Sequence, residues 1–160
     1  MRTEEDEQRV NLEQEKMQEG AGELAYVGNL PAGEYYLGDP CYVIAEDEWL
    51  NFCHLLSTFD REKMQEVSLC TNGMIAEFNG HKVFVTSTNC GDGSYRDQLG
   101  NSYPVDAGLI GLIPLALCTK RFDGLGHKFE AKSQPIKISV TTGRWIDCKE
   151  IHVNSRVIKT

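Results

Sequence analysis

The chain has 160 residues, of which 41% are hydrophobic, and a formal net charge of −8. This length supports one hydrophobic core and excludes an array of several large domains. No apolar run approaches the roughly 20 residues that a membrane-spanning helix needs, and residues 1–9 are acidic where a signal peptide is basic. We therefore expect a soluble, cytoplasmic protein with no membrane association.

The negative charge is concentrated in residues 1–23, which hold eight acids and three bases. Val10, Leu12 and Met17 are too few to give this arm a core-facing stripe. We expect a disordered arm or a solvated helix, followed by a single β-rich domain over residues 24–160. A partner-binding helix is the alternative to a plain solvating tail, and charge blocks of this size favour the tail. The acidic balance also argues against nucleic-acid binding, which needs clustered Lys and Arg.

The first globular residues predict short strands. A-Y-V-G at 25–28 and E-Y-Y-L-G at 34–38 flank a turn that contains Pro31 and Gly33. Asp39-Pro40 interrupts this pattern, because proline lacks an N–H donor and disfavours helical dihedrals at the residue before it. C-Y-V-I at 41–44 is predicted as a further strand.

Residues 46–59 predict the one amphipathic helix. Large apolar side chains recur at helical spacing, and three acids occupy the first turn, where the helix dipole favours negative charge. We expect Trp49 and Phe52 to anchor this helix in the core.

The segment from residue 68 to residue 114 predicts antiparallel strands. Asn79-Gly80 between apolar runs is a strong hairpin signal, because both residues tolerate positive φ. From Lys82 to Pro114 two turn signals separate three strand-like runs, which we interpret as a β-meander that continues the same sheet. The adjoining stretch 107–118 is too irregular to assign to strand or helix.

The last third of the chain alternates again around turns, and Ile136, Ile138 and Val140 show the period of two of a half-buried strand. Further strands are expected at 128–130, 144–147 and 151–158. The fold class is therefore α+β and β-rich. We expect an antiparallel sandwich or a partly open barrel, with one amphipathic helix covering one end.

Polar side chains near chain reversals are the candidate ligand-binding residues, because carboxylates are costly to bury unless they are hydrogen-bonded, paired or bound to a ligand. These candidates are Asp39, Asp92, Tyr95, Asp97, Tyr103 and Asp106. G-D-G-S-Y-R-D at 91–97 resembles a calcium loop, but it lacks the D-x-D-x-D-G spacing and the later glutamate. We favour a tight turn at Asp92-Gly93 and capping of the next reversal by Asp97.

Asp39 and Asp106 can each be read as a turn-capping acid. Asp106 is in addition expected to be partly buried, because it lies between Val105 and the apolar run 107–110. A buried aspartate needs donors, and Tyr95, Tyr103 or Arg96 are the predicted ones.

Six cysteines are irregularly spaced and include no C-x-x-C pair. This spacing argues against a zinc knuckle and a redox dithiol, so we expect free thiols, several of them packed as small hydrophobic side chains. The even count leaves a secreted, disulfide-bonded protein as the alternative, which the lack of a signal segment disfavours. No cofactor and no metal site are predicted.

Three motifs carry a resemblance to known proteins: Y-L-G-D-P-C-Y-V-I at 36–44, G-D-G-S-Y-R-D at 91–97 and Y-P-V-D-A-G-L-I-G at 103–111, with G-L-G-H at 124–127. In this order they resemble a family of uncharacterised proteins of bacteria and their phages, a domain of unknown function. The resemblance extends over about residues 30–146 and implies no activity. The acidic arm and the scattered cysteines lie outside the shared pattern.

Two classes of function stay open. The first is a non-enzymatic binding or regulatory module whose acidic surface meets a basic partner protein, and the lack of a nucleophile-and-base constellation favours it. The second is a metal-dependent hydrolase or nucleotide-handling enzyme that uses Asp39, Asp92, Asp97 and Asp106 around a divalent cation. Convergence of two or more of these carboxylates in an open pocket would favour the enzyme.

Overall fold

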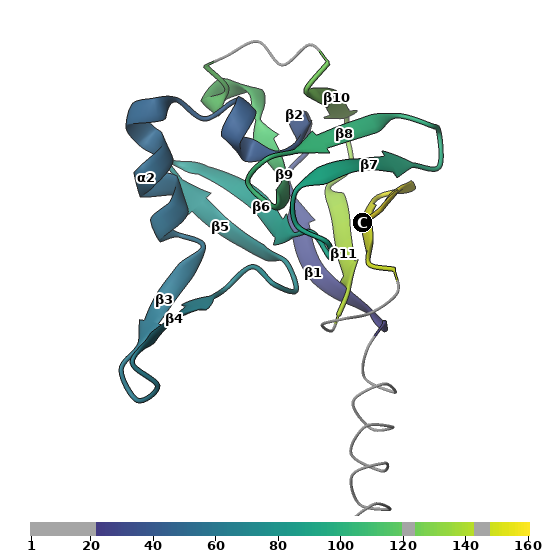
Figure 1. The fold of residues 1–160 in the computed structure, drawn as a ribbon. Helices are drawn as coiled ribbons and strands as arrows, with labels where there is room; N and C mark the ends of the chain where they lie inside the picture. The colour runs from purple at the N-terminus through teal and green to yellow at the C-terminus, as the bar shows by residue number, and fades with distance from the viewer. Residues whose placement is uncertain (1–21, 120–123, 143–147) are drawn as a thin grey trace, which may run out of the picture.

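The chain folds into two antiparallel sheets and a layer of short helical elements in a computed structural model, which describes residues 22–119, 124–142 and 148–160 (Figure 1). Sheet A has six strands in the order β1-β11-β12-β13-β7-β8, and sheet B has five in the order β10-β2-β9-β6-β5. Neither sheet closes into a barrel. The predicted β-rich α+β class is confirmed, in its sandwich form.

The elements divide among the two sheets, the helical layer and one separate hairpin. Sheet A contains β1 (Leu24–Leu30), β7 (Gly93–Asp97), β8 (Ser102–Val105), β11 (Ile136–Thr141), β12 (Glu150–Val153) and β13 (Arg156–Lys159). Sheet B contains β2 (Gly33–Gly38), β5 (Met74–Phe78), β6 (His81–Ser87), β9 (Leu109–Pro114) and β10 (Gly126–Ala131). The helical elements are η1 (Pro40–Tyr42), α2 (Glu46–His54) and η2 (Leu115–Leu117), and the hairpin is β3 (Ser57–Asp60) with β4 (Gln65–Ser68).

The first core cluster fills the space between the two sheets. Strand β11 shows how the sequence builds it: Ile136, Ile138 and Val140 are fully buried, while Lys137 between them is exposed. Side chains alternate between the faces of a strand, so these three residues form the predicted inward face, although Ser139 and Thr141 on the opposite face are also buried, at 9% and 5% exposure. From sheet B, Phe84 of β6 is among the side chains that meet this cluster.

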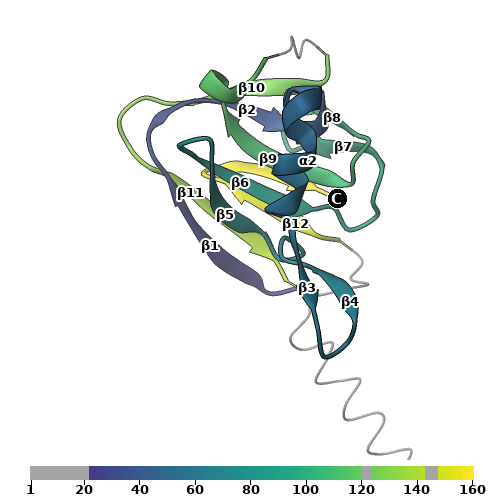
Figure 2. The same ribbon diagram turned by 90° about the vertical axis from the view of Figure 1, so that its left-hand side faces the viewer.

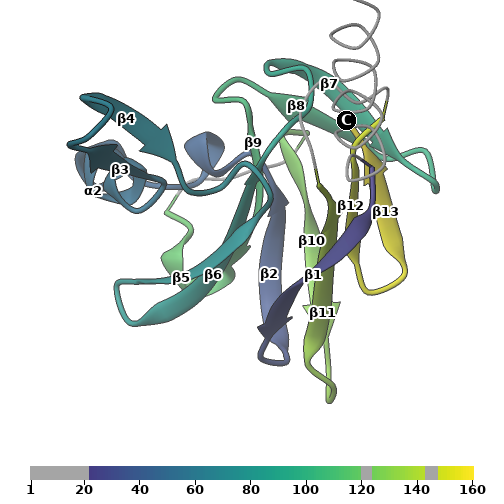
Figure 3. The same cartoon turned by 90° about the horizontal axis from the view of Figure 1, so that it is seen from below.

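A second cluster lies on the other face of sheet B, where α2 and the short helices pack (Figure 3). Phe52 of α2 is fully buried, and its ring centroid lies 5.6 Å from that of the half-buried Trp49 and 5.3 Å from that of Phe78. Both predicted anchors therefore fix α2 to the sheet. The three central strands of sheet B, β2, β9 and β6, therefore have buried side chains on both faces.

Two predicted elements end or fold differently. The helix stops at His54, because Ser57 begins β3 and pairs with Ser68 of β4. C-Y-V-I does not form a strand: Pro40 opens η1, and the Asp39 side chain accepts a hydrogen bond from the backbone N–H of Cys41. Aspartate followed by proline is a favoured start for a helical turn. The Asp-Pro pair that interrupts the strand pattern therefore begins the short helix η1.

The predicted meander is wrong in its connectivity. Strand β6 pairs directly with β9, while the β7–β8 hairpin between them in sequence belongs to sheet A. The backbone N–H of Thr88 donates to the carbonyl of Gly108 at 3.0 Å, which closes the point where the chain leaves sheet B and returns to it. Gly91 and Gly108 adopt φ of 72° and 69° near this crossing, a region that glycine occupies at little cost.

Two smaller predictions at the hairpins have separate outcomes. The Asn79-Gly80 hairpin is confirmed, with φ of 48° and 81° at its two residues. The run 151–158 forms two strands, β12 and β13, around a turn in which Asn154 has φ of 53°. The expected strand at 144–147 and most of the acidic arm lie outside the described residues.

Candidate functional site

The buried Asp39 carboxylate joins two chain reversals that lie far apart in sequence. Its Oδ1 accepts a hydrogen bond from the backbone N–H of Cys41 at 2.9 Å. Its Oδ2 accepts from the backbone N–H groups of Asp106 at 2.9 Å and Ala107 at 2.7 Å. Hydrogen bonds to an ionised acceptor are the strong ones, so this fully buried carboxylate fixes the turn at residue 40 against the corner at residue 106.

Gly38 and Gly126 let the ring of Tyr36 lie close against the backbone of sheet B. Gly111, Gly38 and Gly126 stand opposite one another on β9, β2 and β10. A Cβ atom at Gly38 would come within 2.6 Å of the Tyr36 hydroxyl oxygen, and one at Gly126 would overlap the same ring. The Tyr36 hydroxyl donates to the carbonyl of Asp39 at 2.8 Å. The Y-L-G-D-P and G-L-G-H motifs therefore supply parts of one packed corner.

Asp106 differs from its prediction. Its side chain is exposed, and the donor that it receives is the Tyr42 hydroxyl at 2.6 Å. The expected partial burial is wrong, because the backbone N–H of Asp106 turns inward to Asp39 while its carboxylate turns to solvent. Burial and the hydrogen bond to Asp106 raise the pKa of Tyr42 above its ordinary value.

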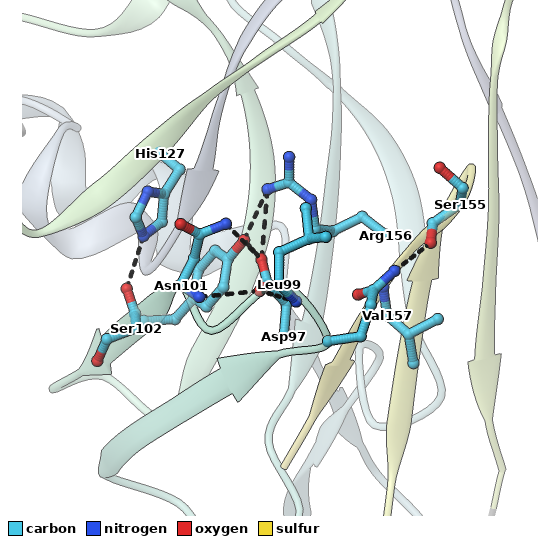
Figure 4. Close-up of polar contacts among 10 residues, drawn as sticks. Asp97, Leu99, Asn101, Ser102, His127, Ser155, Arg156 and Val157 are labelled. Carbon is cyan, nitrogen blue, oxygen red and sulfur yellow. Dashed lines mark hydrogen bonds and ion pairs between the residues drawn. The ribbon is translucent and has the colours of Figure 1, made fainter.

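Asp97, at the end of β7, is the centre of a second carboxylate network (Figure 4). Its Oδ1 accepts from the backbone N–H groups of Leu99 at 2.9 Å and Asn101 at 3.0 Å. Its Oδ2 accepts from the Asn101 side-chain amide at 3.0 Å and from the Tyr103 hydroxyl at 2.7 Å. Asp97 therefore caps the following reversal, as predicted.

Arg156 completes this network from the neighbouring strand β13. Its Nη1 donates to the Tyr103 hydroxyl at 2.9 Å and lies 3.5 Å from Oδ2 of Asp97. Burial raises the pKa of Asp97, but the hydrogen bonds from Tyr103, Asn101 and Leu99 outweigh burial and hold that pKa below its usual value. Burial and the bond to Asp97 raise the pKa of Tyr103, so the hydroxyl stays protonated at neutral pH. Donors of the fold therefore occupy both oxygens of the Asp97 carboxylate.

His127 and the remaining two candidates border these networks. The His127 ring packs edge-on against the Tyr103 ring, with 4.7 Å between the two ring centroids. Its Nε2 lies 2.7 Å from the carbonyl oxygen of Ser102. The Tyr95 hydroxyl donates to the carbonyl of Gly91 at 2.6 Å. Asp92 is exposed at the bend before β7, so its side chain is not held in a shared site with the other carboxylates.

The four predicted aspartates thus do not share one site. Asp39 and Asp106 lie at the same corner, Asp97 holds the reversal after β7, and Asp92 lies at an exposed bend. Among residues 22–119, 124–142 and 148–160, no group of three or more His, Cys, Asp or Glu side chains is arranged to hold a metal ion. The Asp39 carboxylate accepts a hydrogen bond from the backbone N–H of Asp106. This contact stabilises the fold and does not bring the two carboxylates together.

Lys149 is a buried lysine whose burial was not predicted from the sequence. It is 3% exposed, and its Nζ donates to the carbonyls of Thr71 and Ser87 at 2.6 Å each and to the Thr86 hydroxyl at 3.1 Å. Burial lowers its pKa to about 8. Three uncharged oxygens therefore accept hydrogen bonds from the ammonium group of Lys149, which has three hydrogens to donate. No local pattern around Lys149 marks it as buried.

Arg156 and Tyr42 were also missed as partners of the predicted aspartates. A signal existed for Arg156, because it has the same parity as the inward-facing Ile158 in an alternating strand. No such signal existed for Tyr42, whose contact with Asp106 joins residues 64 positions apart.

The six cysteines are free thiols, as predicted. Cys70 is buried, and burial raises the pKa values of Cys118 and, with the nearby Asp39 carboxylate, of Cys41 to about 12. A thiol is a nucleophile only as its thiolate, so Cys41 and Cys118 are poor candidates for catalysis at neutral pH.

Comparisons with protein-family models, with curated proteins and with solved structures found no match. The resemblance to a family of bacterial and phage proteins therefore stays a prediction. Within the described ranges, no helix has the length and apolar character to cross a membrane.

Proposed function

We propose that this chain is a small acidic, non-enzymatic binding or regulatory module, and that it binds a partner protein with a basic surface through residues 46–69. We call these residues the α2–hairpin region, since they comprise α2, β3, β4 and the links between them. The hairpin projects from the body of the molecule on the side of α2 (Figures 1 and 2). It is thus accessible to a partner without rearrangement of the two sheets.

The observation that carries this proposal is the position of the exposed apolar side chains. Four of the seven exposed large hydrophobic residues found among the described positions lie in the α2–hairpin region: Leu50 at 67%, Phe59 at 55%, Met64 at 74% and Leu69 at 47% exposure. Single exposed apolar residues are common, but several in one short region of the chain are typical of an interaction surface.

The charge of the same region defines the partner's chemistry. Residues 46–69 hold six acids and two bases, a net charge of −4. Glu46, Asp47 and Glu48 lie in the first turn of α2, and the other acids lie on the hairpin. Apolar side chains among acids complement a surface of apolar and basic residues, and such complementarity accelerates association and fixes orientation.

The carboxylate networks also support a module without catalysis. The oxygens of Asp39 and Asp97 accept hydrogen bonds from the fold's own donors, so neither of these two carboxylates is free to act as a base toward a substrate. The alternative, a metal-dependent hydrolase or nucleotide-handling enzyme, needs converging carboxylates, and the described residues contain no such group.

The test compares two variants of the full chain in affinity capture from the native cell, followed by titration of the purified captured protein. The double variant Leu50→Ser/Phe59→Ser should weaken binding about tenfold or more, equivalent to about 1.4 kcal/mol. Leu99→Ser is the matched control, because Leu99 is equally exposed, at 68%, outside the α2–hairpin region.

A second variant, Glu46→Gln/Asp47→Asn/Glu48→Gln, should lower the association rate and flatten its dependence on salt. Equal loss in Leu99→Ser, or unchanged affinity in Leu50→Ser/Phe59→Ser, would contradict the proposed surface. Turnover of a small-molecule substrate by the purified chain would contradict the non-enzymatic function.

A further inference from the structure

The outer face of sheet A, on the opposite side of the molecule from α2, carries a group of cations. Strand alternation places Lys137 on the side opposite the buried Ile138, and Lys159 opposite the buried Ile158. Arg96 shares this face, because it stands directly across from Lys159 in the β13–β7 pair. We call these three residues the sheet A cations.

The arrangement of the sheet A cations is electrostatically unfavourable by itself. Like charges directly opposite each other on paired strands destabilise a sheet, and Lys159 and Arg96 occupy such positions. Glu150 lies directly across from Lys159 on its other side and offers one opposite charge; its carboxylate oxygen also lies 3.0 Å from Nε2 of His152. Among the described residues, no carboxylate forms an ion pair with Lys137, Lys159 or Arg96. The Lys137 ammonium lies 5.9 Å from the centroid of the Tyr26 ring. The three cations outnumber the one carboxylate directly across from them, so positive charge is in excess at these positions.

We propose that the acidic segment of residues 1–21 docks on the outer face of sheet A in the same molecule. This segment holds seven acids and three bases, so its net charge of −4 complements the sheet A cations. Its own apolar residues have a counterpart too, because Leu24 and Tyr26 of β1 are 52% and 60% exposed on that face. Opposite charges and a small apolar contact favour the same site.

The point of attachment and the length of the segment make this contact possible. The backbone N–H of Gly22 donates to the carbonyl of Thr142 at 2.7 Å, which fixes the chain at the β1 edge of sheet A. Six strands at about 4.8 Å spacing span about 24 Å. Twenty-one residues reach about 30 Å even as a helix and about 70 Å when extended. The acids can therefore reach Lys159 and Arg96, on the fourth and fifth strands in sheet order.

Attachment to the same chain lets weak contacts suffice. A short flexible connection gives an effective concentration in the millimolar range, so surface ion pairs that would not hold a separate peptide can hold a tethered one. The docked segment would also exclude other acidic ligands from the face.

The test uses backbone amide NMR spectra of the full chain, with charge-neutralising variants at exposed positions. In Glu4→Gln/Glu5→Gln/Asp6→Asn/Glu7→Gln, the amide signals of Arg96, Lys137 and Lys159 should shift. The control Glu46→Gln/Asp47→Asn/Glu48→Gln/Glu62→Gln removes the same charge from the α2–hairpin region and should leave these signals in place.

The reciprocal variant and the salt dependence complete the test. Arg96→Gln/Lys159→Gln should shift the amide signals of residues 4–7. Both effects should vanish between about 0.01 M and about 1 M salt, over which the Debye length falls from about 30 Å to about 3 Å. Shifts that are independent of protein concentration support docking within one molecule.

Three results would overturn the proposal. One is the absence of any shift at the sheet A cations when the acids are neutralised. Another is a shift that grows with protein concentration, which would assign the face to a second copy of the chain. The third is a face that responds to added poly-glutamate but not to neutralisation of residues 4–7, which would assign it to a separate acidic partner.

Discussion

Asp39 and Asp97 use the same chemistry over very different sequence distances. Each is a buried aspartate that accepts backbone N–H groups and stands beside a tyrosine hydroxyl. The backbone donors of Asp97 are two and four residues away, whereas Asp39 also binds donors 67 and 68 residues away. One carboxylate shapes its own loop, and the other holds two distant corners together.

This difference explains why the sequence revealed one role and concealed the other. An aspartate followed by a polar reversal predicts its own capping, because the donors follow in the next few residues. A carboxylate whose donors arrive from another strand has no local signature. We expect substitutions at Asp39 and Asp97 to differ in how much free energy of unfolding is lost and in how far from the substituted residue the structure is disturbed.

The largest effect is expected for Asp39→Ala. The substitution leaves three N–H donors without their carboxylate, and the corner at residues 106 and 107 loses its tie to the turn at residue 40. The free energy of unfolding should fall by about 3 to 4 kcal/mol, measured by urea denaturation. Amide exchange at Ala107 should quicken at the same time.

Asp92→Ala is the matched control for that measurement, since Asp92 is exposed. It should change the free energy of unfolding by about 0.5 kcal/mol or less. Comparable losses in both variants would show that Asp39 does not act as a long-range tie.

A smaller effect is expected for Asp97→Asn, about 2 kcal/mol, because asparagine keeps one acceptor oxygen for the local N–H groups but loses the charge beside Arg156. The pKa of Asp97 is lowered in the folded chain, so its ionised form stabilises the fold above the unfolded value of 3.8. The stability difference between the parent and Asp97→Asn should therefore be full above about pH 5 and shrink as the pH falls below 3.8.

Denaturation curves at several pH values measure this dependence. A difference that stays constant down to pH values well below 3.8 would contradict the ionised, hydrogen-bonded state of Asp97. Amide exchange at Ala107 should remain at the parent rate, which separates this local clamp from the Asp39 corner.

The smallest effect is expected for Asp106→Asn, about 1 kcal/mol or less in the free energy of unfolding. Its carboxylate is exposed and accepts one hydrogen bond, from Tyr42, while its backbone N–H still donates to Asp39 after the substitution. A loss as large as that of Asp39→Ala would mean that the Asp106 side chain, and not its backbone, carries the corner.

Local features of the fold were predictable where neighbouring residues determine them. Alternation along Ile136 to Val140 predicted an inward face, and helical spacing predicted that Phe52 would be an anchor, because burial follows the geometric period of each element. Asn79-Gly80 predicted a hairpin through its tolerance of positive φ. The end of the helix was missed, because pairing of Ser57 with Ser68 outweighed the continuing apolar pattern.

The tertiary structure alone decided how these elements meet. The strands from residue 81 to residue 114 look like one meander in sequence, but they divide between two sheets because β6 finds its partner in β9. Lys149 became a buried cation only where three oxygens from Thr71, Thr86 and Ser87 met it. Periodicity determines which face of an element is apolar, whereas partners far apart in the chain are selected by packing and hydrogen-bond satisfaction in the assembled core.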